Sequence, residues 1–310
     1  MIASLRESYG RHVTKLASSN ERIIMLEGDL ADSTQSEPFQ IKYPDRHFQI
    51  GIAEQNMVGM AAGLAYEGKL PIVNSFAAFI AMRACEQVRT DIAYPNLNVK
   101  LVVSHSGLSA GTAGPTHHTV EDIGIMRSIP NMKVLVPGDA VEVEQVIESA
   151  LETNGPVYIR ISAIDSRTVM TESKRFKIGK GTVISDGDDL TIFTTGTMVD
   201  QGLSVCEELQ NKHNIFARLV QMASIKPLDK EIIEEAIDKQ SPIISIEEHN
   251  IIGGLGSAVA EVIAEYGKAC SFHRIGILDR FSPITGNPPY LFKSERIDED
   301  SILKMILQII

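Results

Sequence analysis

Apolar residues follow two alternating spacings along the chain. Short runs rich in apolar residues, such as residues 22–26 and 99–104, are separated by segments in which apolar residues recur every three to four positions, such as residues 5–18 and 140–152. The first spacing is typical of buried strands and the second of amphipathic helices. Their regular alternation predicts an α/β fold with mainly parallel sheets covered by helices.

The predicted elements form two groups. The first group has strands at residues 22–26, 48–52, 71–74, 99–104, 134–136 and 157–161, and helices at 5–18, 57–65, 79–93, 120–127 and 140–152. Residues 165–178 lose the apolar periodicity and gather charged and hydroxyl side chains, which predicts a solvated connection. The second group has strands at 190–194, 215–221 and 242–247, and helices at 198–211, 229–239, 257–266 and 297–310. We therefore expect two doubly wound domains, residues 1–170 and 171–310.

A single acidic residue, Glu54, marks the junction between the strand at 48–52 and the helix that follows. The helix carries small and apolar residues at helical spacing, namely Met57, Val58, Ala61, Ala62 and Ala65. Because small residues let this helix pack closely, we expect Glu54 to face packed protein or a ligand, where a carboxylate needs a hydrogen-bond partner. The alternative is that Glu54 caps its own helix, where the helix dipole stabilises a negative charge.

Composition narrows the classes of function. The chain has 310 residues and a net charge of -11, which disfavours binding to nucleic acid or to an anionic membrane. The first residues are charged throughout and no apolar run could span a bilayer, so we expect neither a signal peptide nor a membrane span. Cys85, Cys206 and Cys270 are far apart in the sequence, so a disulfide framework or zinc site is not indicated and a cytoplasmic location is expected.

A glycine-containing loop at residues 105–119 follows the predicted strand at 99–104 and contains three histidines, His105, His117 and His118. Glycine permits close backbone approach to a ligand, and histidine exchanges protons near neutral pH. The loop is therefore a candidate site. Incidental surface histidines and a zinc site are the alternatives, although His117 and His118 are adjacent and lack the spacing of helical zinc ligands.

Phe76 and Phe79 flank two alanines at the turn between the strand at 71–74 and the next helix. Core packing is the default role of such rings. Because a flat ring between small neighbours also offers a stacking surface, a binding site for a heteroaromatic ligand is the second interpretation.

Three sequence contexts together resemble the transketolase family, whose members use thiamine diphosphate. They are Gly-Ile-Ala-Glu-Gln-Asn-Met around Glu54, Ser-Phe-Ala-Ala-Phe at residues 75–79, and Gly-Pro-Thr-His ending at His117. They look like the family's pyrimidine-binding domain, and their order is also similar to that of 1-deoxyxylulose-5-phosphate synthase. The second half, with Glu-Glu-His-Asn-Ile-Ile-Gly-Gly-Leu-Gly-Ser at 247–257, resembles the transketolase C-terminal domain.

The resemblance implies roles for individual residues. Glu54 would hydrogen-bond the aminopyrimidine ring of thiamine diphosphate, so that the cofactor can lose its thiazolium proton and act as an electron sink. Phe79 would stack on that ring with Phe76 behind it, and Asp29, in the polar loop after residues 22–26, would be a further cofactor contact. His117 would move protons to and from substrate hydroxyls.

The implied activity is the transfer of a two-carbon ketol unit between (phospho)sugars. By the same resemblance, His105, Ser33 and Arg6 would hold the sugar phosphate. Two positions depart from the family. An aspartate that reads a sugar hydroxyl is replaced by Ala113, and a phosphate-binding arginine is replaced by Ala163, although two other arginines, Arg160 and Arg167, are near in the sequence.

A partner chain is also implied. Family members bind the diphosphate and Mg²⁺ through a separate domain with a Gly-Asp-Gly motif and a later asparagine. Here the similar run, Asp-Gly-Asp-Asp at 186–189, precedes a predicted strand and is interpreted as a turn. We assign no metal ligand in this chain, and expect an N-terminal, diphosphate-binding subunit of a split transketolase as partner, in a two-fold heterotetramer or a homodimer of the pair.

Three alternatives remain. The chain could be the β subunit of a 2-oxo acid dehydrogenase or decarboxylase, an enzyme like deoxyxylulose-phosphate synthase, or a non-catalytic scaffold subunit. The glycine-rich run at 253–256 could cradle a phosphate before the helix at 257–266. Because it lacks the full Gly-x-Gly-x-x-Gly pattern, helix entry and tight packing are the preferred interpretation.

Overall fold

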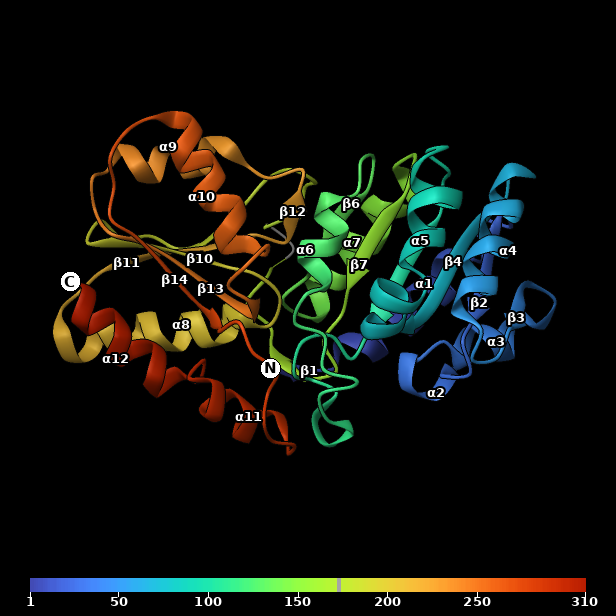
Figure 1. The fold of residues 1–310 in the computed structure, drawn as a ribbon, viewed down its shortest axis with the longest axis horizontal. Helices are drawn as coiled ribbons and strands as arrows, with labels where there is room; N and C mark the ends of the chain where they lie inside the picture. The colour runs from blue at the N-terminus through green and yellow to red at the C-terminus, as the bar shows by residue number, and fades with distance from the viewer. Residues whose placement is uncertain (172–173) are drawn as a thin grey trace.

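Two mainly parallel sheets, each covered by helices on both faces, organise the chain and confirm the predicted α/β class (Figure 1). The computed structural model describes residues 1–171 and 174–310, so Glu172 and Ser173 of the predicted connection lie outside the described residues. Most of the first sheet belongs to the blue-to-green half of the chain in Figure 1, and the second sheet belongs to the yellow-to-red half.

The first sheet positions the candidate site. Its seven strands lie in the order β12 (Ser224–Lys226), β6 (Lys133–Leu135), β7 (Val157–Arg160), β5 (Lys100–Ser104), β4 (Leu70–Phe76), β2 (Ile23–Glu27) and β3 (His47–Gln49). All neighbouring pairs are parallel except β12 with β6. Strand β2 lies between β3 and β4, so the chain turns from one side of β2 to the other. In open α/β sheets the crevice at such a switch point is where ligands bind.

Helices cover both faces of this sheet. One face carries α1 (Leu5–Leu16), α3 (Glu37–Lys42) and α7 (Ala140–Glu152). The other carries α4 (Glu54–Tyr66), the π-helical turns η2 (Phe79–Arg83) and η3 (Val88–Ala93) on either side of α5 (Cys85–Gln87), and α6 (Asp122–Ser128). Three short elements lie in the loops: α2 (Ala31–Thr34), η1 (Pro44–Arg46) and η4 (Gly111–Ala113). Apolar residues at the predicted helical spacing, such as Met57, Val58 and Ala61 of α4, are fully buried.

The second sheet has five strands in the order β14 (Phe272–Ile277), β13 (Ile243–Asn250), β10 (Leu190–Thr194), β11 (Ala217–Gln221) and β9 (Thr182–Ser185). Only β9 runs antiparallel to its neighbour within this sheet. Figure 1 shows α9 (Lys230–Asp238) and α10 (Leu255–Tyr266) on one face, and α8 (Met198–Glu208) with α12 (Glu299–Ile309) on the other. The turn η5 (Leu209–His213) extends α8, and α11 (Pro288–Glu295) precedes α12.

The structure differs from the sequence-based elements in several places, including one helix and an edge strand of each sheet. The helix predicted at 79–93 is a succession of π and α turns rather than one regular helix. Strand β14 was missed, because three of its six residues are exposed or half-exposed and the segment includes His273 and Arg274. Strand β12, from the second half of the chain, completes the edge of the first sheet, and β1 (Ile2–Ala3) pairs with β8 (Ser166–Arg167). The domain division at residues 170 and 171 stays a prediction.

No helix within residues 1–171 and 174–310 is both long and apolar enough to cross a membrane. All three cysteines are free thiols.

Candidate functional site

A cavity of about 440 Å³ opens at the carboxyl end of the first sheet. It is built from the loops that follow β2, β3, β4 and β5, so residues far apart in the sequence meet there. Ten residues line it: Gly28, Asp29, Leu30, Ile52, Glu54, Phe76, Phe79, Arg83, Thr116 and His117. Five of the eight residues that the sequence analysis selected are among them.

Glu54 is the first residue of α4 and is 1% exposed. Its carboxylate does not cap its own helix, which has no side-chain cap. Instead one oxygen accepts a hydrogen bond from Ser75 Oγ at 3.4 Å, and the other accepts one from Arg83 Nη1 at 2.7 Å. The buried carboxylate is therefore aimed across the cavity rather than at the helix amides.

Aromatic rings form one wall of the cavity. Phe76 ends β4 and Phe79 begins η2, and their rings stack with centroids 5.8 Å apart. The ring of His105 stacks on Phe76 at 4.0 Å, while His117 meets Phe79 edge-on at 5.4 Å. These rings come from a strand end, a helix start and a loop. Phe79 lines the cavity, so core packing, which the sequence analysis took as the default role of this ring, does not describe it.

Arg83 belongs to the site and was missed by the sequence analysis. Its guanidinium lies over the ring of Phe79 at 4.4 Å while it donates to Glu54. The π-helical turn from Phe79 to Arg83 brings the two residues together, and such turns are frequent at functional sites. The sequence contained one indication of this role: Arg83 is the single charged residue in the apolar run at residues 76–85, four positions after Phe79.

The three residues predicted to hold a phosphate lie beside one another but do not line the cavity. Arg6 Nη1 donates to the backbone carbonyl of Ser33 at 2.7 Å, and Arg6 Nε is buried without a hydrogen-bond partner. Ser104 Oγ lies 3.0 Å from His105 Nδ1. Burial, with the nearby charges of Arg6 and His117, lowers the pKa of His105 to about 4. His105 is therefore neutral at neutral pH and can donate one N–H without carrying a positive charge.

The loop that carries Asp29 and Ser33 is tied to a buried carboxyl that the sequence analysis did not select. Glu27 accepts hydrogen bonds from Gly28 N, Thr34 Oγ1 and Ser36 Oγ at 3.1, 2.8 and 2.6 Å. Burial raises the pKa of Glu27 to about 7 despite these bonds. Asp29 itself has φ of 65°, a left-handed conformation that is uncommon outside glycine, and its amide donates to Gln49 Oε1.

The histidines of the long loop have different surroundings. His117 lines the cavity, and its Nδ1 lies 3.0 Å from Thr116 Oγ1. His118 is buried, with Nε2 2.8 Å from the carbonyl of Gly111, so it does not share the cavity with His117. Within the described part of the chain, no group of three or more histidine, cysteine, aspartate or glutamate residues has the arrangement of a metal site.

The two arginines near Ala163 are not free to replace the missing phosphate ligand. Arg160 is buried and its Nε donates to Asp122 at 2.9 Å. Arg167 pairs with Asp200 of α8 at 2.9 Å and with Glu207 at 3.3 Å. Ala113 is exposed at the end of η4.

The two glycine- and aspartate-rich runs are structural. Residues 186–189 form the turn between β9 and β10, and Asp188 pairs with Lys239 at 2.8 Å. The run at 253–256 leads into α10, whose first amides, Leu255 N and Gly256 N, donate to the buried carboxylate of Glu247. A carboxylate thus occupies the place where a phosphate would bind, which supports helix entry as the function of this run.

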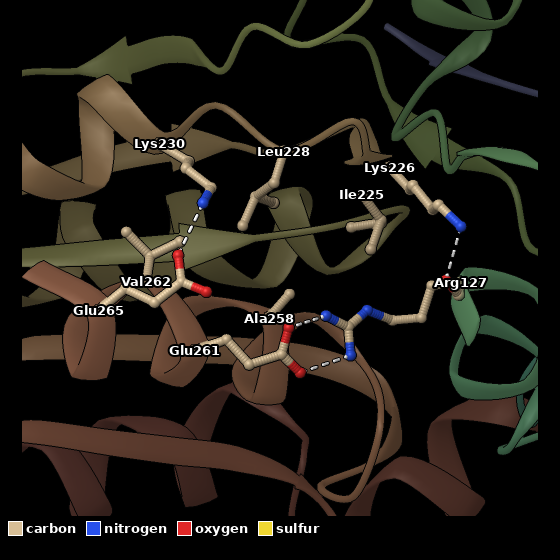
Figure 2. A pocket seen from close by; sticks show the side chains of 9 residues that line it. All are labelled: Arg127, Ile225, Lys226, Leu228, Lys230, Ala258, Glu261, Val262 and Glu265. Carbon is tan, nitrogen blue, oxygen red and sulfur yellow. Dashed lines mark hydrogen bonds and ion pairs between the residues drawn. The ribbon is translucent and has the colours of Figure 1, made fainter. Parts of the chain in front are cut away.

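Another cavity, of about 240 Å³, lies between β12, α6 and α10 (Figure 2). Its charged side chains are paired with one another: Arg127 with Glu261 at 2.5 Å, and Lys230 with Glu265 at 2.7 Å. Lys226 donates to the backbone carbonyls of Arg127 and Ile129. Because four of the five charged side chains form ion pairs and the fifth, Lys226, is bound to backbone carbonyls, this cavity offers less chemistry than the one around Glu54.

Comparison with known proteins gives matches along nearly the whole chain. Residues 3–167 match the family described as transketolase, pyrimidine binding domain, and residues 179–302 match the transketolase C-terminal domain. A protein of Methanocaldococcus jannaschii named for a transketolase C-terminal section is 44% identical over 306 residues, covering 98% of this chain and 95% of that protein. One of the subunits of the apulose-4-phosphate transketolase of Actinobacillus succinogenes is 38% identical over 283 residues, covering 90% of this chain and 91% of that protein.

A solved structure described as a split gene transketolase, inactive β4 tetramer, superposes with a TM-score of 0.90. It is 38% identical to this chain, and the match covers 99% of this chain and 98% of that one.

Proposed function

This chain belongs to the transketolase family, and on that premise we propose that it is one subunit of a split transketolase, in which a partner chain supplies the domain that binds the diphosphate and Mg²⁺. The pair transfers a two-carbon ketol unit between (phospho)sugars. The observation that carries the proposal is the fully buried Glu54 carboxylate, which shares one cavity with Phe79 and His117.

The residues around the cavity fit the aminopyrimidine ring of thiamine diphosphate. Glu54 offers a buried carboxylate as hydrogen-bond acceptor, Phe79 offers a flat ring, and Ile52 adds an apolar side chain. Bound thiamine diphosphate supplies the electron sink that cleavage of a carbon–carbon bond next to a carbonyl requires. Glu54 would hold the ring through a hydrogen bond, and Asp29 also lines the cavity.

His117 is the residue that moves protons on the substrate. Its ring faces the cavity and is held by an edge-on contact with Phe79, and a histidine there can take or return the proton of a sugar hydroxyl. Arg6, Ser33 and His105 do not line this cavity, but His105 stacks on Phe76 at its wall, and in this proposal the three residues hold the anionic end of the sugar. The name of the apulose-4-phosphate relative supports a phosphorylated sugar as one substrate.

A partner subunit completes the site. Within residues 1–171 and 174–310 there is no cluster of metal-ligating side chains, so the ligands of Mg²⁺ come from the partner in this proposal. Ile52, which lines the cavity, is 73% exposed, and Phe48 on β3 and Met60 on α4, the strand and helix on either side of it in the sequence, are also exposed. Exposed apolar residues around a binding cavity are typical of a protein interface. We propose a two-fold heterotetramer in the cytoplasm, consistent with the description of the β4 relative as inactive.

The test of this proposal is Glu54→Gln in the complex reconstituted with the partner. We expect turnover of a ketose donor to fall by about 10²–10⁴-fold, because glutamine cannot share a proton with the ring. The partner should still co-purify with the variant. Glu67→Gln, at the exposed end of the same helix, is the matched control and should retain full turnover. Unchanged turnover in Glu54→Gln would contradict the assignment.

A further inference from the structure

The loop that carries His117 is held at its base by the second domain. Within the loop, Gly107 and Thr119 form a reciprocal pair of backbone hydrogen bonds, at 3.0 and 2.9 Å, that closes residues 107–119 into a ring. Glu248, on β13 of the second sheet, accepts a hydrogen bond from Leu108 N at 2.6 Å. The residue after that ring is also tied to β13, because Asn250 N donates to the carbonyl of Val120 at 2.7 Å.

Glu248 lies so close to Gly107 of the loop that a side chain at position 107 would have no space. A Cβ atom added to Gly107 would lie 2.4 Å from Glu248 Cδ, well inside van der Waals contact. Gly107 also has φ of 61°, a conformation that glycine adopts without strain. The glycine at this position therefore permits the close approach of the Glu248 carboxylate to the backbone.

Arg160, on β7 of the first sheet, also connects the His117 loop to β13. Its Nη2 donates to the carbonyls of Thr119 and Glu248, at 3.2 and 3.1 Å, while its Nε donates to Asp122. Glu248, Arg160 and Asp122 are all more than nine-tenths buried. Because a buried charged group that loses its partner is costly, this arrangement resists rearrangement and holds the loop in one position.

We propose that Glu248 is a positioning residue for the reaction, through which the C-terminal domain fixes the loop that presents His117 to the cavity. This inference rests on the proposed function, since it assumes that His117 acts on the substrate. Within the described part of the chain, the hydrogen-bond partners of Glu248, Leu108 and Arg160, are not among the residues that line the cavity, so its effect on turnover passes through the loop. In this proposal, the second domain contributes to the reaction by holding the loop that carries the proton-transferring side chain, His117, in one position.

A double-mutant cycle in the reconstituted complex tests the coupling. Glu248→Ala should lower kcat by about 10–100-fold, because small displacements of a reacting group have effects of this size. The dissociation constant of thiamine diphosphate should stay within about twofold, because Glu54 and Phe79 are on other elements. In a His117→Ala background, Glu248→Ala should lower kcat by no more than about threefold further, since the displaced side chain is already gone.

Two further variants keep the test decisive if Glu248→Ala assembles poorly. Glu248→Gln retains a carbonyl oxygen for Leu108 N and should stay within about threefold of wild-type turnover. Gly107→Ala, which forces the loop and Glu248 apart, should reproduce the loss seen in Glu248→Ala. Glu247→Ala is the matched control, because this neighbouring buried carboxylate binds the amides of α10 rather than the loop and should show no coupling to His117.

A second readout does not depend on turnover. Hydrogen–deuterium exchange of the full chain should show faster exchange across residues 105–119 in Glu248→Ala, with no change in residues 28–36. The positioning role would be overturned if Glu248→Ala lowered kcat by the same factor in the wild-type and the His117→Ala backgrounds. It would also be overturned if hydrogen–deuterium exchange in the loop were unchanged. If His117→Ala alone leaves turnover unchanged, the proposed role of His117 fails, and loop exchange still decides whether Glu248 holds the loop.

Discussion

Glu54 is a buried carboxylate whose two oxygens have different partners. Ser75 is a neutral donor from β4, and Arg83 is a charged donor that is only partly buried, with 43% of its side chain exposed. A buried carboxylate is stable only when such donors compensate its lost hydration. Arg83 contacts a Glu54 oxygen and the face of Phe79. The proposal assigns these same two groups to the aminopyrimidine ring. Arg83 therefore occupies contacts that the cofactor would use.

Removing Arg83 should strengthen cofactor binding. In Arg83→Ala, Glu54 loses a donor and the ring of Phe79 becomes free, so the affinity of the reconstituted complex for thiamine diphosphate should rise by about three- to tenfold, the value of one exposed ion pair and one cation–π contact. Calorimetric titration of the complex measures this constant. Arg89→Ala, an exposed arginine on η3, should leave it unchanged. Weaker binding by Arg83→Ala would mean that Arg83 itself contacts the cofactor.

Among the elements, α1 and the loop after β2 are packed so closely that one glycine determines their separation. A Cβ atom on Gly10 of α1 would lie 2.0 Å from the carbonyl oxygen of Gln35. That loop carries Asp29 and Ser33, and Arg6 of the same helix donates to the Ser33 carbonyl. The helix and the loop are therefore in close contact along the backbone as well as through Arg6. In contrast, Gly63 of α4 has no atom within 4 Å of an added Cβ.

This contrast predicts opposite effects of the same substitution. Gly10→Ala should destabilise the protein by about 1–3 kcal/mol, because the backbone of Gln35 has to move. Gly63→Ala should stabilise it by about 0.5–1 kcal/mol, because alanine favours the helix and meets open space. Urea unfolding of the full chain measures both. Equal stabilities of the two variants would contradict the close packing of α1.

For the whole molecule, several carboxyl groups are buried at junctions between elements. Burial raises the pKa of Glu27, Glu142, Glu247 and Glu248 to about 7. In the unfolded chain such groups titrate near 4.5, so the folded state binds more protons between these two values. Their contribution to stability is complete below about pH 4.5 and is lost as the pH rises through about 7.

The protein should therefore melt at a higher temperature at pH 6 than at pH 8. Scanning calorimetry measures the difference. Buried Lys100, whose pKa is lowered to about 7, contributes in the opposite direction over this range, so the difference should be smaller than the four carboxyl groups alone would produce. Glu142→Gln should reduce the difference, because glutamine keeps an acceptor for Gly138 N and does not titrate. The exposed variant Glu67→Gln should not. An equal or higher melting temperature at pH 8 would contradict the prediction.

The sequence located those site residues that follow directly from strand ends. Glu54, Phe79 and His117 each lie in a loop or helix start after a predicted strand, and parallel strands bring such positions to one edge. Arg83 was missed because a π turn, rather than a regular helix, brings it beside Phe79 and Glu54. The low pKa of His105 also could not be predicted, because it arises from burial and from Arg6, 99 residues earlier in the sequence.

By itself, the sequence determined the fold class, the order of the longer buried strands and helices, and the family, because apolar spacing and short motifs are local properties of the chain. Only the tertiary structure decided which residues share a cavity, which arginines are already paired, and that Glu248 reaches the His117 loop from 140 residues away. The physical reason is that hydrogen bonding and burial depend on distances in space. Strand order and domain packing set those distances, and no local pattern encodes them.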